Sequence, residues 1–155
     1  KNKESPQYLG IHICENKEFL SKIINIVESM PNNNPGYDVI CGKDKKIDVK
    51  CSCLICDNQW NFLINNNKTA DYFLMIAFDN REYLNVQHIW LVKGDAVIEK
   101  TTYNSKEFII NEKRAVDISK GHKSLERWKK YEKTDMLKKA QKICGELNSN
   151  NIKVE

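Results

Sequence analysis

The stretch PGYDVICGKDKKIDVKCSCL, residues 35–54, decides the fold because its two halves have the pattern of a β-hairpin. Tyr37–Cys41 predicts a short strand, and Gly42–Lys45 has the composition of a tight turn. Lys46–Leu54 alternates apolar and polar residues with a period of two, as a strand with one buried face does. The sequence therefore predicts two antiparallel strands joined by a turn.

The hairpin gathers three charged residues. Because side chains alternate across a strand, Asp48 and Lys50 share one face, and the turn brings Asp38 beside them. Two carboxylates held close together repel one another unless a cation lies between them, and oxygen ligands suit Mg²⁺. Lys50 would steady an attacking water or neutralise charge that develops on a phosphate. The alternative is an ion pair on a solvated surface, worth ~0–1 kcal/mol.

A helix is predicted ahead of the hairpin. Apolar residues between Leu9 and Met30 recur with helical spacing, and Pro31 ends the pattern. Glu15 lies at the edge of the apolar stripe, so it is the helical acid that would reach the two aspartates. The alternative for Glu15 is a boundary glutamate that points to water.

Beyond residue 54 the pattern predicts more strands and then helices. Trp60–Ile64 would complete a three-strand meander, and Tyr72–Phe78 is apolar enough for a central strand covered on both faces. Further elements are expected as a strand at His88–Val92, a hairpin within Thr101–Ile110, helices at Ser124–Tyr131 and Asp135–Leu147, and a loose tail after Asn148. The chain is thus expected to be one α/β domain over residues 1–155, with a core at about 9–93 and a helical part at about 94–148.

The run Pro35-Gly36-Tyr37-Asp38, followed by Asp48-Val49-Lys50, resembles the active-site signature of the PD-(D/E)xK nuclease superfamily. The resemblance implies a restriction-endonuclease-like mixed sheet flanked by helices, built from a helix, a three-strand meander, a crossover near Asn66–Ala70 and another strand. It implies Asp38 and Asp48 as metal ligands, Lys50 as the catalytic lysine and Glu15 as an auxiliary acid. Mg²⁺, with Mn²⁺ as a substitute, would be the cofactor, DNA the substrate, and a homodimer the form that cuts both strands.

Several basic residues are candidates for contacts with DNA phosphates. The net charge is +4, from 25 Lys and Arg against 21 Asp and Glu, which is compatible with a polyanionic partner but does not demand one. The candidates are Arg81 in a loop and Lys123, Arg127 and Lys130 around a predicted helix. The alternative for Arg81 is a charged surface turn. The alternative for the predicted helix is that Trp128 and Tyr131 serve only to pack it against the rest of the domain.

The six cysteines and the absence of a leader bear on location. We expect reduced thiols in a cytoplasmic or nucleoid-associated protein, with a zinc site among Cys51, Cys53 and Cys56 as the alternative. No apolar run approaches the ~20 residues that cross a bilayer, and no secretion signal is evident. The first residue is Lys1, so the chain is expected to be a domain taken from a longer protein or a processed one.

Three functions follow as hypotheses. The first is a metal-dependent DNA endonuclease of the restriction or homing type that hydrolyses phosphodiester bonds. The second is a nucleic-acid-binding module of the same fold whose active site is idle. A small zinc-binding interaction domain is a third hypothesis. Serine hydrolase and P-loop chemistry are not indicated, since the chain has neither a Gly-x-Ser-x-Gly elbow nor a Walker-type loop.

Overall fold

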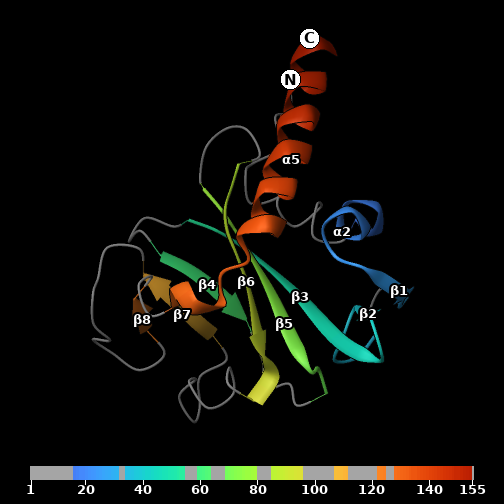
Figure 1. Ribbon diagram of the computed structural model, residues 1–155. Helices are drawn as coiled ribbons and strands as arrows, with labels where there is room; N and C mark the ends of the chain where they lie inside the picture. Colours follow the sequence, from blue (N-terminus) through green and yellow to red (C-terminus); the bar gives the residue numbers. More distant parts are fainter. Residues whose placement is uncertain are drawn as a thin grey trace.

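A computed structural model describes residues 16–31, 34–54, 59–63, 69–79, 85–95, 107–111, 122–124 and 128–154, with the backbone alone for 59, 63, 107–111, 122–124, 148 and 150–154. In these ranges the chain forms a larger and a smaller sheet, the helices α2 and α5, and a 3₁₀ turn (Figure 1). In chain order they are α2 (Lys17–Ile23), β1 (Ile26–Ser29), β2 (Val39–Cys41), β3 (Lys45–Cys53), β4 (Gln59–Leu63), β5 (Tyr72–Phe78), β6 (Val86–Lys93), β7 (Glu107–Asn111), β8 (His122–Ser124), η1 (Lys129–Tyr131) and α5 (Thr134–Val154).

The larger sheet has the strand order β1-β2-β3-β5-β6. Its first three strands form an antiparallel meander, β3 and β5 are parallel, and β5 and β6 are antiparallel. The smaller sheet has the order β4-β7-β8. The chain is therefore mixed α/β, as predicted. The predicted hairpin at residues 37–54 is confirmed, with its turn at residues 42–44.

The meander differs from the predicted one by one strand. Trp60–Ile64 was expected to pair with Lys46–Leu54, but β4 pairs with β7 in the other sheet, and this prediction was wrong. The third strand of the observed meander is β1, which pairs with the other edge of β2, and the expected place beside β3 is occupied by β5. A single long helix from Leu9 to Met30 was also wrong, because α2 ends at Ile23 and Ile24 is already extended. The run from Ile23 to Val27 is mostly β-branched, which favours a strand once β2 is available to pair with it.

The C-terminal part contains strands as well as a helix. Of the predicted helix at Ser124–Tyr131, Ser124 belongs to β8 and Lys129–Tyr131 form a 3₁₀ turn, so that prediction was wrong at these positions. The predicted helix at Asp135–Leu147 is confirmed as α5, which runs on to Val154 through the residues expected to form a loose tail. No helix within the described ranges connects β3 to β5, where a crossover helix was expected near Asn66–Ala70. Residues 66–68 lie outside these ranges.

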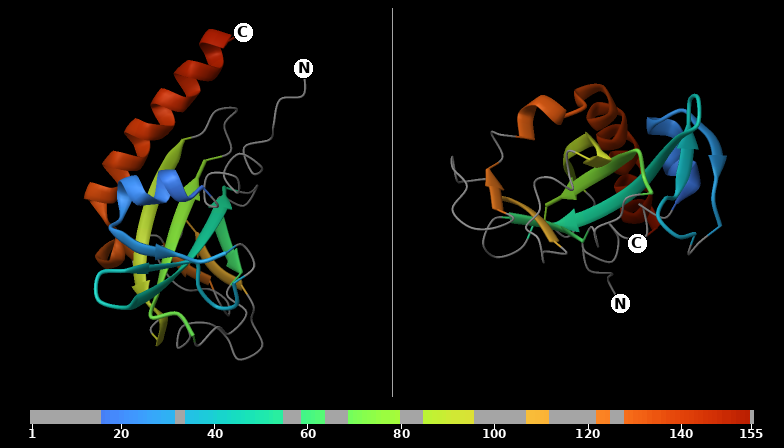
Figure 2. Two further views of the ribbon diagram at one scale, coloured as in Figure 1. Left: turned by 90° about the vertical axis from the view of Figure 1, so that its right-hand side faces the viewer. Right: turned by 90° about the horizontal axis from the view of Figure 1, so that it is seen from below.

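The larger sheet separates two apolar cores (Figure 2). On one face α2 and α5 pack against the sheet, and Leu74, Ile76 and Phe78 of β5 point into that core. On the other face Phe73, Met75 and Ala77 meet β4 and Trp128. Because β5 is covered on both faces, its sequence is continuously apolar, as was predicted for Tyr72–Phe78. Among the described helices, none combines the length and apolar character needed to cross a bilayer.

Candidate active site

Asp48 and Lys50 lie on the face of β3 that points away from α2 and α5. The residues between and beside them, Ile47 and Val49, pack into the core under those helices, so strand alternation directs Asp48 and Lys50 to the opposite side. Lys50 Nζ is 3.4 Å from Asp48 Oδ2. Asp48 is only 8% exposed, so this pair is not the fully solvated surface pair that was the alternative. A buried carboxylate is costly unless it has partners, and Lys50 is one partner of Asp48.

Asp38 is held against the same strand from the neighbouring side. In the β2–β3 ladder Val39 faces Ile47, and continuing this register by one residue places Asp38 opposite Asp48. The Val49 amide, which lies between Asp48 and Lys50 in the chain, donates to Asp38 Oδ2 at 2.7 Å. The structure therefore brings together Asp38, Asp48 and Lys50, as the hairpin pattern predicts.

The segment before β2 positions Asp38 through its backbone. The Met30 amide donates to the Asp38 carbonyl at 2.9 Å, and the Asp38 amide donates to the Ile47 carbonyl at 2.8 Å. Asn34 Nδ2 donates to the Tyr37 carbonyl at 3.0 Å and so closes the turn that leads into Asp38. Both edges of the Asp38 backbone are thus hydrogen-bonded, which fixes the direction of its side chain.

Gly36 allows this turn to pass close to the chain at Thr69. Its φ is +87°, and a Cβ built on it would lie 2.7 Å from the Thr69 Cβ. We predict that Gly36→Ala destabilises the fold by about 1–3 kcal/mol, because an L residue at this φ is strained and the methyl group meets Thr69. Urea unfolding followed by circular dichroism measures the change.

Gly42→Ala is the matched control for Gly36→Ala. Gly42 also has a positive φ, +55°, but nothing lies within 4 Å of a Cβ at that position. The difference between the two variants isolates the contact with Thr69. Equal losses of stability in the two variants would contradict a steric role for that contact.

The charges of the three residues leave the site with an excess of negative charge. Two carboxylates face one ammonium group, and hard oxygen donors are the ligands that Mg²⁺ prefers. Magnesium keeps several of its waters, so a pair of carboxylates is an adequate protein contribution, and the donor set fits the implied metal. Within the described ranges, no group of three or more His, Cys, Asp or Glu residues is arranged to hold a metal ion.

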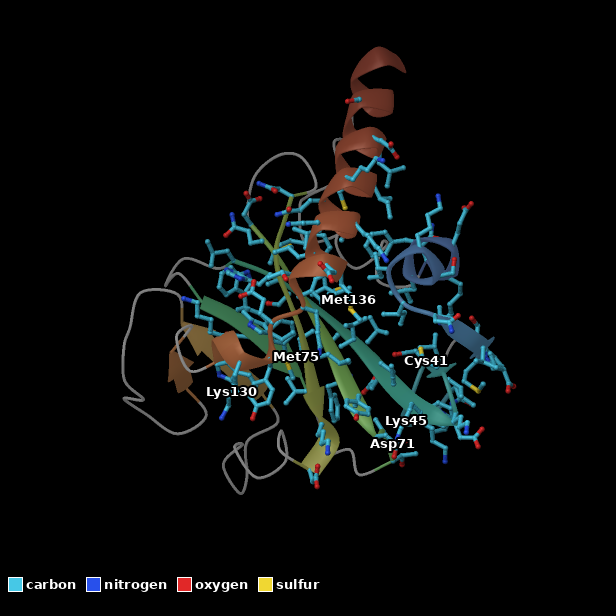
Figure 3. All side chains as sticks on the ribbon, in the orientation of Figure 1. Cys41, Lys45, Asp71, Met75, Lys130 and Met136 are labelled. Atoms are coloured by element: carbon cyan, nitrogen blue, oxygen red, sulfur yellow. The ribbon has the colours of Figure 1, made fainter. Side chains whose placement is uncertain are left out.

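The other predicted site residues are not part of this cluster as far as the structure describes them. Glu15, Arg81 and Arg127 lie outside the described residues, and Lys123 is described by its backbone in β8 alone. Lys130 is exposed on η1, with its ammonium 5.2 Å from the centre of the Tyr131 ring. Figure 3 shows Lys130 well separated from Lys45 at the start of β3, so Lys130 is not close to the β2–β3 hairpin.

A second polar pair, His88 and Glu132, docks the C-terminal segment. His88 Nδ1 is 2.7 Å from Glu132 Oε2, and its ring is stacked on Trp90 with centroids 5.0 Å apart. The backbone of Glu132 also forms an isolated antiparallel β-bridge with that of Trp90. The Lys133 amide donates to the Ile89 carbonyl at 2.9 Å. His88 was expected at the end of a strand, but it lies inside β6. Its carboxylate partner anchors the start of α5 to the sheet.

The cysteines do not behave uniformly. Cys51 is disulfide-bonded, so the expectation that all six thiols are reduced was wrong at this position. Cys41, Cys53 and Cys144 are free. Burial raises the pKa of Cys144 to about 12. Burial, and to a smaller degree the Asp79 carboxylate, raise the pKa of Cys53 to about 11. These two thiols therefore stay protonated near neutral pH and are poor nucleophiles.

Two supporting residues were not predicted from the sequence. Asn34 closes the turn ahead of Asp38 with its own side chain, which donates to the Tyr37 carbonyl. Asp71 accepts a hydrogen bond from the Lys46 amide at 2.9 Å and donates its own amide to the Lys46 carbonyl, which fastens β3 to the start of β5. A polar residue directly ahead of an apolar strand was the available signal for Asp71. Comparisons add no relative to this picture, because no protein-family model and no curated protein matches the chain.

Proposed function

We propose that this chain is a metal-dependent DNA endonuclease that hydrolyses phosphodiester bonds at the Asp38–Asp48–Lys50 site. The observation that carries the proposal is the Asp38 carboxylate bound to the Val49 amide, directly beside the buried Asp48 and its partner Lys50. Two acids and a lysine on one face of a hairpin form a constellation suited to phosphoryl chemistry.

The order of the elements supports a restriction-endonuclease-like fold. α2 is followed by the antiparallel strands β1, β2 and β3, and β5 then lies parallel to β3 after a crossover. A helix, a three-strand meander, a crossover and a further strand are what the resemblance implies. The crossover passes through β4 of the smaller sheet, and this is a departure from the implied helix.

Each residue has a distinct part in the proposed chemistry. Asp38 and Asp48 would hold Mg²⁺ or Mn²⁺, which, when bound, polarises the scissile phosphate and lowers the pKa of a water. Lys50 lies next to Asp48 and would offset the negative charge that accumulates on the phosphate as its bond to the leaving oxygen breaks. The Val49 amide donates to Asp38 Oδ2 and so holds the Asp38 carboxylate in its orientation.

A catalytically idle nucleic-acid-binding module is the second candidate. The observation that favours it is the 3.4 Å contact between Lys50 Nζ and Asp48 Oδ2. The Lys50 ammonium in that position competes with a divalent metal ion for the Asp48 carboxylate. Under this alternative the chain binds DNA and no divalent metal produces cleavage.

The location and assembly belong to the proposal as well. A homodimer would allow both strands of a duplex to be cut. Disulfides are rare in a reducing cytosol, so the disulfide at Cys51 weighs against the cytoplasmic or nucleoid location expected from the sequence.

The direct test is a cleavage assay on plasmid, linear, branched and single-stranded DNA with Mg²⁺, Mn²⁺ or EDTA. Cleavage that needs Mg²⁺ or Mn²⁺ and stops in EDTA is the expected result. Binding of DNA without cleavage under every condition would select the idle module.

Lys50→Ala separates chemistry from metal binding. We expect cleavage to slow by about 10²–10³-fold, the usual loss when one group that stabilises transition-state charge is removed. Mn²⁺ binding, measured by calorimetry, should persist because Asp38 and Asp48 are unchanged. A Lys50→Ala protein that cleaves at the wild-type rate would show that the lysine has been assigned wrongly.

A further inference from the structure

A third charged residue, Lys46, shares the face of β3 that carries the site. Positions 46, 48 and 50 alternate with Ile47 and Val49, which pack into the opposite core. Successive side chains on one face of a strand are about 7 Å apart, so Lys46 lies one such step before Asp48. Lys45, its neighbour in the chain, is exposed and belongs to the other face.

The Lys46 side chain is held in place by an aromatic ring. The Lys46 Nζ lies 5.4 Å from the centre of the Tyr37 ring, and Tyr37 directly precedes Asp38 in the chain. Neither the Lys50–Asp48 ion pair nor the His88–Glu132 ion pair involves Lys46. A cation that rests on a ring keeps its N–H donors available to an anion, whereas a cation paired with a carboxylate does not.

The backbone at Lys46 is rigid, so its position relative to Asp48 is constant. The Lys46 amide donates to Asp71 Oδ2 at 2.9 Å, and the Asp71 amide donates to the Lys46 carbonyl at 2.8 Å. Asp71 therefore uses its carboxylate on the backbone of Lys46. Figure 3 shows Asp71 and Lys45 near one another at this end of β3 and β5.

The other end of this face is occupied by the smaller sheet. The Asn61 amide of β4 donates to Ser52 Oγ at 2.9 Å, so β4 crosses β3 just beyond Lys50. Among the described elements, a strand of nucleic acid seated at Asp48 is therefore blocked in the direction of Ser52. We therefore take its path from Asp48 to run toward Lys46.

We propose that Lys46, supported by the Tyr37 ring, binds the backbone phosphate next to the scissile one and so sets the register of the DNA strand along β3. This inference rests on the proposed function and names a contact of the same site with its substrate. The step of about 7 Å between alternate residues of a strand is comparable to the separation of successive phosphates on a nucleic-acid strand. Lys46 is then a substrate-binding residue, and Asp38, Asp48 and Lys50 act on the adjacent phosphate.

The test measures duplex DNA binding by fluorescence anisotropy over a series of NaCl concentrations in EDTA, where cleavage cannot occur. Lys46→Gln should weaken binding about tenfold, the weak end of the range for a charge-assisted hydrogen bond. It should also reduce the slope of log K against log[salt] by about 0.9, which corresponds to one phosphate contact. Lys46→Arg keeps the charge and should restore the slope. Circular dichroism confirms that each variant is folded.

Lys45→Gln is the matched control, because it removes the same charge one residue away on the other face. Its salt slope should equal that of the wild type. Equal slopes for Lys45→Gln and Lys46→Gln would overturn the inference while cleavage by the wild type leaves the proposed function standing. If the wild type binds DNA and Lys46→Gln lowers its salt slope, but the wild type never cleaves DNA, the nuclease proposal is overturned and the inference that Lys46 binds a phosphate stands. A wild type that does not bind DNA overturns both.

Discussion

Asp48→Asn should abolish metal-dependent DNA cleavage, with a loss of at least about 10³-fold, and should leave the fold intact. Asparagine has nearly the same shape as aspartate but lacks the charge that attracts a divalent cation. Asp48 is the most buried of the three site residues, and its Oδ2 lies 3.4 Å from Lys50 Nζ. Cleavage rates with Mg²⁺ and Mn²⁺ binding by calorimetry measure the two effects.

The stability of this variant should change by no more than about 1 kcal/mol. Removal of the charge ends the repulsion with Asp38 but also ends the pairing with Lys50, whose side chain is 25% exposed and can reach water. Asp44→Asn is the matched control, since Asp44 lies in the turn of the same hairpin with φ +61°, which asparagine tolerates well. Asp44→Asn should cleave normally. Wild-type cleavage by Asp48→Asn would remove the basis for the proposed function.

Trp60→Ala should destabilise the protein by about 3–5 kcal/mol, a large part of the ~5–15 kcal/mol typical of a domain. Trp60 is fully buried, and its Nε1 donates to the Phe78 carbonyl at 2.8 Å, which ties β4 to the end of β5. Its ring meets those of His88 and Trp90 edge to face, with centroids 5.3 and 6.0 Å apart. The truncation would leave a large cavity between the two sheets.

Urea unfolding followed by far-UV circular dichroism measures this loss. Trp60→Phe keeps a ring and loses the hydrogen bond, so its loss should be smaller than that of the alanine variant. Val27→Ala is a control at a position that is 64% exposed, where a change within about 0.5 kcal/mol is expected. A loss below about 1 kcal/mol for Trp60→Ala would mean that β4 is not essential to the second core.

The parts of the structure that the sequence predicts well are local ones. The hairpin that carries Asp38 and Asp48 is recognised because its strands flank a stretch of turn-forming residues, and the positive φ values of Gly42 and Asp44 agree with a turn there. The strand at Tyr72–Phe78 is recognised because both of its faces are buried, which requires a continuous apolar run. The three residues of the candidate site are brought together for the same reason, since all lie on one hairpin.

The parts that were predicted wrongly depend on distant partners. Ile26–Ser29 fits a helical pattern equally well, and only pairing with β2 makes it a strand. Trp60–Leu63 has the composition of a strand, but its partner Glu107–Asn111 is more than 40 residues away, so the sheet to which it belongs cannot be read locally. Lys46 alternates with Asp48 and Lys50 in the sequence, yet its ring partner Tyr37 becomes evident only in three dimensions.

The central position of β3 has a consequence for how the protein could respond to a substrate. β3 is hydrogen-bonded to β2 on one side and to β5 on the other, and Asp71 adds a further link at its start. A strand anchored along both edges opens only when the whole domain unfolds. Any closure around a bound molecule must therefore come from the surrounding segments. Asp38 and Asp48 would keep their positions during such a closure.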